Sequence, residues 1–362
     1  MPPPYPPSQL ITGVVWDWST YVRLANGSDN WPITWADDNH QYTSWGDGSG
    51  FASSTTGRWS LGFARVQGDW NNYQGFNVWG GGNTENPAQF EGKSYGILSV
   101  NGILYAWWGP LSDLWFATET RVLISTDHSR TWTQSTWRWT DLDNLYGGSF
   151  LNFGRDYAGA RDTYVYSYFP RGSTWALQIP GSADLARVPK DRIMDQSAYE
   201  WFAGFDLNGN PTWTPTLSAR RPVFEDPNGL RTVSVGYDPG LGRYLLTSQH
   251  TKVEPRSDVD TDQWGLFEGP EPWGPWRTVA YYTAIDNWGN TKGHISFYFA
   301  PKWFSPNGKD FTLVFTNADS WGTVRGAFTT TSPGPPVASF IASPVEGPAP
   351  LAVTFTDQSI SS

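Results

Sequence analysis

The sequence predicts an all-β protein that folds as a five-bladed β-propeller. Residues that favour strands and turns dominate, with 23 Trp, 17 Tyr, 20 Phe, 38 Gly and 28 Pro among 362 residues, whereas the helix formers Lys, Glu and Ala are sparse. From about residue 10 to 330 the chain also repeats one texture, in which short aromatic or β-branched runs are interrupted by Gly, Asn, Asp and Pro.

This texture groups into five loose units with short predicted strands. A propeller suits such units because its blades leave only short sheet edges exposed and place ligand sites on the central channel. The units are a hairpin between Asp29 and Asp47 with 59–66 and 76–79, then 94–108 with 121–132, 150–168 with 176–224, 232–249 with 264–282, and 294–299 with 311–315.

Two segments within these units have a more specific interpretation. Residues 125–132 resemble the Asp-box turn of sialidase-like propellers, with Ser129 where glycine is usual. We therefore expect Asp127 to close a turn and Trp132 to pack between strands. In residues 190–202 the apolar side chains have helical spacing, which predicts one short helix or turn.

Composition also divides the chain. Residues 1–9 are a proline-rich lead, expected to be extended and poorly ordered. The propeller is predicted over 10–330 and a linker over 331–336. The segment 337–362 resembles the opening strands of a PKD-type immunoglobulin-like module, too short for a complete sandwich. This resemblance implies further C-terminal modules in the full-length protein.

Charge and cysteine content exclude several functions. The formal net charge of −10 argues against nucleic acid as a partner, and the absence of cysteine excludes disulfides and thiolate chemistry. No apolar run is long enough to span a membrane. The proline-rich start lacks the features of a signal peptide, so we expect a secreted or cell-surface protein whose export signal has been removed.

The first hairpin carries the predicted chemistry. Asp29 precedes the strand-like run 31–35, Asp47 follows the run 41–45, and residues 36–40 form the predicted turn. Because the two open ends of an antiparallel hairpin are neighbours, both acids are expected at one rim. Glycosidic cleavage needs one protonated and one ionised carboxyl group. Which of the two is the acid stays open, as does the alternative that both only cap strand ends.

Several stretches resemble a bacterial five-bladed propeller family, formerly of unknown function, that includes endo-D-arabinofuranases acting on mycobacterial arabinan. The resemblance spans most of residues 12–328 and implies a propeller in which Asp29 and Asp47 are the catalytic candidates. The arabinan specificity belongs to one branch of that family. The matching stretches are 28–35, 45–48, 153–162, 187–190, 199–202, 272–276 and 301–305.

Further residues are predicted to bind substrate around the channel, although each also has a structural explanation. Trp31 can belong to the core, the Arg–Asp pairs can be salt bridges, and a lone His is often neither a ligand nor a sugar contact. No cofactor or metal is predicted, because the acid-rich rim shows no continuous loop of oxygen ligands for calcium. The predicted binding residues are Trp31, Arg155, Asp156, Arg161, Asp162, Tyr199, Glu200, His294 and Lys302.

The sequence thus predicts a secreted glycoside hydrolase that cleaves a polysaccharide with Asp29 and Asp47. Two alternatives stay open. One is a polysaccharide lyase on the same propeller, with Tyr199 or His294 as base and Arg155 or Lys302 neutralising a uronate. The other is a non-catalytic carbohydrate-binding protein whose aromatic faces hold a glycan.

Overall fold

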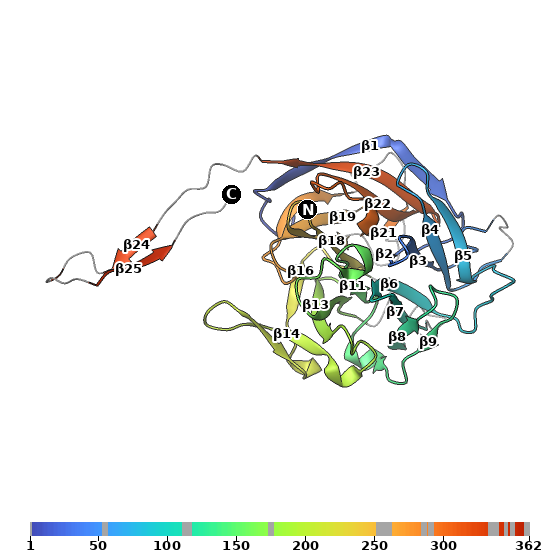
Figure 1. Cartoon of the computed structure of the whole chain (residues 1–362), viewed down its shortest axis with the longest axis horizontal. Helices are drawn as coiled ribbons and strands as arrows, with labels where there is room; N and C mark the ends of the chain where they lie inside the picture. Colours follow the sequence, from blue (N-terminus) through green and yellow to red (C-terminus); the bar gives the residue numbers. More distant parts are fainter. Residues whose placement is uncertain are drawn as a thin grey trace.

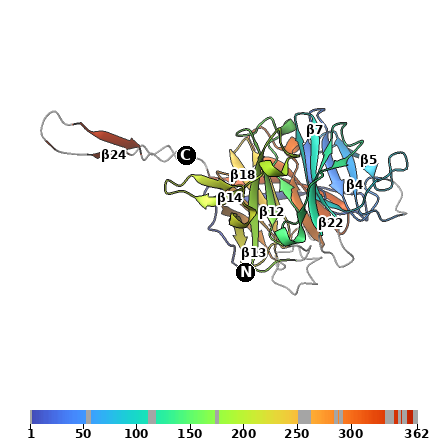
Figure 2. The ribbon, with the colours of Figure 1, turned by 90° about the horizontal axis from the view of Figure 1, so that it is seen from below.

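The computed structural model describes residues 2–52, 57–110, 118–172, 177–250, 263–283, 288, 293–331, 340–343, 347 and 352–357. Five antiparallel sheets stand around a common axis, so the predicted all-β five-bladed propeller is confirmed (Figure 1). From the side, the strands run between two faces of the ring (Figure 2). Each face of the ring carries a different set of residues, and this division decides where a site can form.

The blades follow one another along the chain. Blade 1 contains β2 (Ile33–Trp35), β3 (Gln41–Trp45), β4 (Gly62–Gln67) and β5 (Gln74–Gly80). Blade 2 contains β6 (Lys93–Val100), β7 (Ile103–Gly109), β8 (Glu119–Ser125), β9 (Thr133–Gln134) and β10 (Trp139–Thr140). Blade 3 contains β11 (Ser149–Phe150), β12 (Tyr164–Pro170), β13 (Gly181–Pro189), β14 (Glu200–Phe205), β15 (Pro211–Thr214) and β16 (Pro222–Asp226).

Blade 4 contains β17 (Val233–Asp238), β18 (Arg243–Gln249), β19 (Trp264–Gly269) and β20 (Arg277–Tyr282). Blade 5 contains β21 (His294–Phe299), β22 (Asp310–Asn317), β23 (Trp321–Thr330) and β1 (Ile11–Leu24). Short 3-10 turns connect some strands: η1 (Asp141–Asp143), η2 (Arg155–Tyr157), η3 (Gln196–Ala198), η4 (Leu217–Ala219) and η7 (Pro301–Trp303). Within the described residues, helical structure is confined to such turns.

The ring closes through β1, which the sequence did not assign to a blade. This strand pairs antiparallel with β23, from Ile11 opposite Thr330 to Leu24 opposite Trp321. An N-terminal strand therefore completes the C-terminal blade and joins the two ends of the chain (Figure 1). Closure of this kind removes an exposed sheet edge, which would otherwise offer unpaired backbone groups to other chains.

Aromatic side chains fill the spaces between blades. Trp132, at the end of the predicted Asp-box, stacks on Phe63 of blade 1 with 4.1 Å between ring centroids. The Asp127 carboxylate closes the turn by accepting bonds from the backbone NH of Thr131 and the hydroxyl of Ser125, both at 2.9 Å. Both roles predicted for Asp127 and Trp132 are confirmed.

The inner strands leave little room along the axis. A cavity of about 10 Å³ lies between them, with Tyr95, Phe150, Tyr298 and Phe299 among its walls. Such a volume holds about one water molecule. Among the described residues, this cavity is too small to hold a ligand along the axis.

One local expectation is confirmed and one is wrong. Residues 190–202 contain the short 3-10 helix η3, as expected, and then enter blade 3 as β14, where Trp201 pairs with Ala186. The lead 1–9 is not loose: the Ser8 NH donates to the Thr278 carbonyl at 2.8 Å, and the Tyr5 ring packs 5.3 Å from Phe224. Tertiary pairing outweighs local composition in the lead.

The C-terminal segment forms a small hairpin. β24 (Phe340–Ser343) pairs antiparallel with β25 (Thr354–Asp357) as a two-stranded sheet. Residues 332–339, which include most of the predicted linker, lie outside the described residues. The PKD-type module stays a prediction.

Candidate active site

The two predicted acids meet at the open end of the blade 1 hairpin. The Asp29 NH donates to the Gly46 carbonyl at 2.9 Å, and the Gly46 NH donates back to the Asp29 carbonyl at 2.8 Å. This exchange extends the β2–β3 ladder and places Asp47 directly beside Asp29, as the sequence predicts. We call this end of the propeller the acid end and the opposite end, where residues 36–40 turn, the turn end.

Asp47 is bound by two cations. One carboxylate oxygen forms an ion pair with Lys93, and the other accepts a bond from Arg58 at 2.9 Å. Burial alone would raise the pKa of Asp47, but Lys93 and Arg58 together outweigh it and hold the pKa below its usual value. Asp47 is therefore an ionised carboxylate over the whole range from mildly acidic to neutral pH.

Asp29 has the opposite tendency. Asp29 is only 6% exposed. This burial raises the pKa of Asp29 to about 6, even though the charge of Lys93 acts to lower it. The charge of Asp47 adds to the increase. The side-chain amide of Asn30 donates to one carboxylate oxygen of Asp29 at 3.4 Å. This contact is long, so it does little to stabilise the charged form of Asp29. Asp29 thus keeps a proton at pH values where Asp47 has lost its own.

Lys93 is a residue of the candidate site that the sequence analysis missed. It opens β6 on the neighbouring blade, and its side chain is 7% exposed. A Cβ atom at Gly46 would lie 2.6 Å from the Lys93 ammonium and 3.0 Å from a carboxylate oxygen of Asp29. Glycine at this position therefore makes room for the cation between the two acids. Its position at the start of an inner strand could have indicated that it lies near Asp29, because Asp29 also precedes an inner strand.

Three more buried residues add polar groups beside Asp29 and Asp47. The hydroxyl groups of Tyr95 and Tyr146 are hydrogen-bonded to each other, and burial raises the pKa of Tyr95 well above its usual value. Arg231 is 3% exposed, and its charge acts to lower the pKa values of Asp29 and Tyr146. The acid end therefore combines two carboxylates with fixed positive charge and neutral hydroxyl groups.

Trp31 and His294 lie toward the acid end but within the core. Trp31 is fully buried, with its ring 6.0 Å from Trp45 and 5.4 Å from Trp321. His294 is also fully buried, and its ring lies 5.3 Å from that of Phe315. Neither ring presents a face to a substrate, so both residues support the site from behind.

Arg155, Asp156 and Lys302 lie at the turn end instead. Arg155 donates to the backbone carbonyl of Asp37, and Lys302 donates to that of Asn39 at 2.9 Å. Asp156 accepts bonds from the Ser99 hydroxyl at 2.8 Å and the Gly102 NH at 3.0 Å, at the β6–β7 turn. The inner strands separate all three from Asp29 and Asp47, so the structure does not bring them to the acid pair.

The remaining four predicted residues, Arg161, Asp162, Tyr199 and Glu200, make structural contacts within blades 3 and 4. Arg161 also lies 4.9 Å from the ring centroid of Trp273, and Tyr199 is buried. None of these contacts joins them to the acid pair. The partners are Glu271 for Arg161, the Tyr166 hydroxyl (2.6 Å) for Asp162, the Ile193 carbonyl (2.8 Å) for Tyr199 and Arg187 (2.7 Å) for Glu200.

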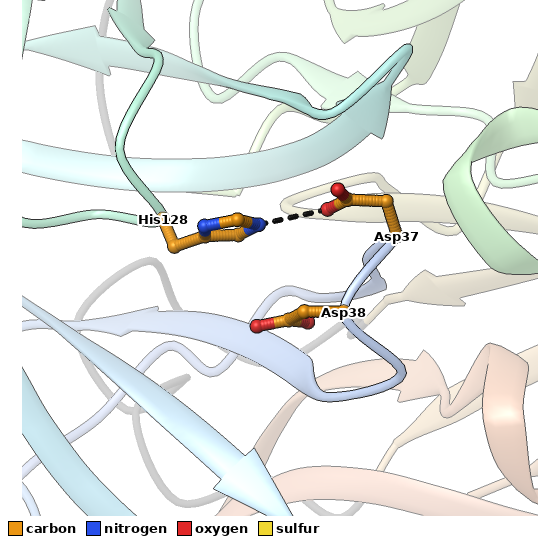
Figure 3. A group of neighbouring side chains, drawn as sticks. All are labelled: Asp37, Asp38 and His128. Carbon is orange, nitrogen blue, oxygen red and sulfur yellow. Dashed lines mark hydrogen bonds and ion pairs between the residues drawn. The ribbon is translucent and has the colours of Figure 1, made fainter.

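Among the described residues, one group of side chains is close enough to share a metal ion: Asp37, Asp38 and His128, whose ligand atoms lie within 4.8 Å of one another (Figure 3). His128 Nε2 already pairs with Asp37 at 2.8 Å, and Asp38 accepts a bond from the Tyr42 hydroxyl at 2.8 Å. The group lies at the turn end and links blade 1 to blade 2. It is remote from the acid pair and takes no part in its chemistry.

Comparisons with solved structures return several enzymes at low identity. The GH43_1 enzyme from Xanthomonas citri complexed with xylotriose is 11% identical over 86% of this chain and 94% of that chain, with a TM-score of 0.47. A family 117 glycoside hydrolase, Zg3597 from Zobellia galactanivorans, is 10% identical over 88% and 91%, with a TM-score of 0.44. An N-acetylgalactosamine deacetylase from F. plautii is 11% identical over 90% and 95%, with a TM-score of 0.45.

Similarities of this size identify no activity. No curated protein matches the sequence, and among the described residues no helix is long and apolar enough to cross a membrane. A family model does match: residues 88–323 fit the family described as a domain of unknown function, DUF4185. Because this match spans well over half of the 362 residues, the chain belongs to the DUF4185 family.

Proposed function

We propose that the protein is a glycoside hydrolase in which Asp29 is the general acid and Asp47 the ionised carboxylate. The observation that supports this assignment is the divergence of the two pKa values within one hairpin: raised to about 6 for Asp29 and lowered for Asp47. Two neighbouring carboxyl groups with opposite shifts are the arrangement that acid–base cleavage of a glycoside needs.

The chemistry follows from these protonation states. Asp29 donates its proton to the glycosidic oxygen as the bond to the anomeric carbon breaks, and Asp47 attacks that carbon or activates a water molecule. Lys93 keeps Asp47 ionised. Gly46 and Gly48 flank Asp47, and the missing side chains there make room for Lys93 beside Gly46 and for Gly27 and Ser28 beside Gly48, so both glycines serve the packing of the site.

We infer further that the substrate is a polysaccharide outside the cell. The resemblance to propellers that include endo-D-arabinofuranases makes D-arabinan the first substrate to test. The PKD-like start of residues 337–362 supports secretion, since such modules accompany extracellular polysaccharide-active proteins.

The test is release of reducing ends from a panel of neutral and acidic plant, algal and bacterial polysaccharides, with D-arabinan included. Asp29→Asn and Asp47→Asn are expected to abolish release from the substrate that the wild type cleaves. Asp37→Asn is the matched control, since it removes an acid from the turn end of the same hairpin. If either Asp29→Asn or Asp47→Asn kept near-full turnover, the two-acid mechanism would be wrong.

The lyase alternative has less support. The groups predicted for it, Tyr199 and His294 as base and Arg155 or Lys302 for a uronate, lie in the core or at the turn end. The same assay separates the two reactions, because a lyase leaves an unsaturated sugar that absorbs in the near ultraviolet. Binding of a glycan without any product would favour a non-catalytic protein.

A further inference from the structure

A groove lies on the side of the propeller, where the first and last blades meet. Its volume is about 330 Å³, at the small end of the range for ligand pockets, about 300–1,000 Å³. One wall comes from β1, whose C-terminal part lies beside β4 and β5 (Figure 1). The other wall is the turn between β4 and β5. The groove residues used below are Ser19, Thr20, Tyr21, Trp70, Asn71 and Asn72.

The groove is separate from the acid pair. β4 begins at Gly62, opposite Trp45 at the acid end, and reaches the turn end at Gln67, which pairs with Gln74 of β5. Trp70 lies in the turn that joins these two strands. A ligand in the groove therefore contacts different residues from one held by Asp29 and Asp47.

An exposed aromatic platform is the main feature of the groove. Trp70 is 37% exposed, and the Arg325 guanidinium lies 4.5 Å from its ring centroid, which holds the ring in place. Tyr21 is fixed as well, because its hydroxyl donates to Asn317 at 2.7 Å. Burying an indole ring against a ligand releases the water that now covers it, so this ring can contribute much of the binding energy.

The polar side chains that line the groove are uncharged, while the Arg325 guanidinium packs against the platform itself. Ser19 and Asn71 are exposed, and Asn72 adds an amide. The Thr20 hydroxyl is already engaged, because it donates to the Asp17 carbonyl at 2.7 Å and accepts the backbone NH of Arg325 at 3.0 Å. No carboxylate is among the described residues that line the groove. Asn72 is already oriented, since its side-chain oxygen accepts the Asp69 NH at 2.8 Å. A flat apolar ring edged by hydroxyl and amide groups complements a sugar, which has apolar CH faces and a hydroxyl rim.

We propose that this groove is a second carbohydrate-binding site that takes an uncharged stretch of oligosaccharide. The proposal rests on the proposed function in one respect: the glycan would be part of the same polysaccharide that the acid pair cleaves. Holding a polymer at two places raises the local concentration of the rest of the chain at the acid end.

Binding can be measured without cleavage. The Asp29→Asn protein is run in native gels that contain beet arabinan, larch arabinogalactan, xylan or barley β-glucan, and retardation is compared with that in a gel without polysaccharide. We expect at least one of these polymers to retard the protein, and Trp70→Ala in the same background to weaken the apparent affinity about tenfold or more. Asn71→Ala is a milder second variant, expected to weaken binding severalfold without disturbing the fold.

Phe205→Ala is the control, because Phe205 is a 55% exposed aromatic residue on blade 3, away from the groove. The proposal is overturned if neither groove variant changes the retardation, or if none of the four polymers retards the protein. It is also overturned if Trp70→Ala instead abolishes a concentration-dependent dimer, which would make a second copy the occupant. Because no step requires cleavage, failure of the hydrolase mechanism and failure of the groove give different results.

Discussion

Replacing Asp29 with Asn should make the protein more stable at neutral pH while it abolishes cleavage. A carboxyl group whose pKa is raised on folding holds its proton more tightly in the folded chain than in the unfolded one. As pH rises from the unfolded pKa of 3.8 to about 6, the unfolded chain ionises first and stability falls. Above pH 6 the loss is complete, and Asn at this position avoids it.

The size of the effect follows from the shift. A pKa change of about two units corresponds to roughly 3 kcal/mol, and Asp29, only 6% exposed, has little solvent to screen its charge. Unfolding entropy of about 2.1 cal/mol/K per residue gives about 0.8 kcal/mol/K for 362 residues. Because part of this effect is already present at pH 4.0, the melting temperature of Asp29→Asn relative to wild type should be about 3 °C higher at pH 7.5 than at pH 4.0.

Scanning calorimetry of both proteins at pH 4.0, 5.5, 6.5 and 7.5 measures this difference, at values away from the sequence pI of about 4.8. Any constant effect of the substitution cancels when the pH values are compared. A flat difference for Asp29→Asn, or one that becomes smaller as pH rises, would refute the raised pKa and with it the assignment of Asp29 as the acid.

Three further predictions concern the same residues and the scaffold. The pH dependence of kcat/KM should be bell-shaped, with an acid limb below pH 3.8 from Asp47 and an alkaline limb near pH 6 from Asp29; a rate that still rises above pH 7 would contradict this. Lys93→Met removes a cation that lowers both pKa values, so both limbs should move to higher pH, and unmoved limbs would exclude Lys93 from the tuning. Asp184→Asn should lower the free energy of unfolding, measured in urea, by about 3 kcal/mol, because the fully buried carboxylate binds two arginine side chains. A loss below about 1 kcal/mol would show that these ion pairs are dispensable for stability.

The local sequence pattern was sufficient to predict those features whose residues are neighbours both in sequence and in space. The strands on either side of residues 36–40, the pairing of Asp29 with Gly46, and the Asp-box turn at Asp127 all depend on contacts within a few residues or one hairpin. The closing pair of β1 with β23 could not be predicted in this way, because Ile11 and Thr330 lie at opposite ends of the sequence. The ion pair of Lys93 with Asp47 also joins different blades.

The misplaced binding residues have a simple geometric cause. Each strand of a blade carries the chain from one face of the propeller to the other, so a residue before an inner strand and a residue after it lie at opposite ends. Asp29 precedes β2, whereas Arg155 and Asp156 follow β11 and Lys302 follows β21. Counting strands would have separated these residues from the acid pair before any coordinates existed.

The same count shows how the acid end is assembled from several blades. Positions at or just before inner strands converge there, and three blades besides the first contribute charged or hydroxyl groups to it: Lys93 and Tyr95 from β6, Tyr146 before β11, and Arg231 before β17. The two acids share one hairpin, but Lys93, one of the two cations that lower the pKa of Asp47, belongs to the next blade. A change in the packing of blade 1 against blade 2 therefore alters the protonation of the pair. Substitutions at the Phe63–Trp132 contact between these blades should shift the pH–rate profile, and not only stability, although neither ring touches the acids.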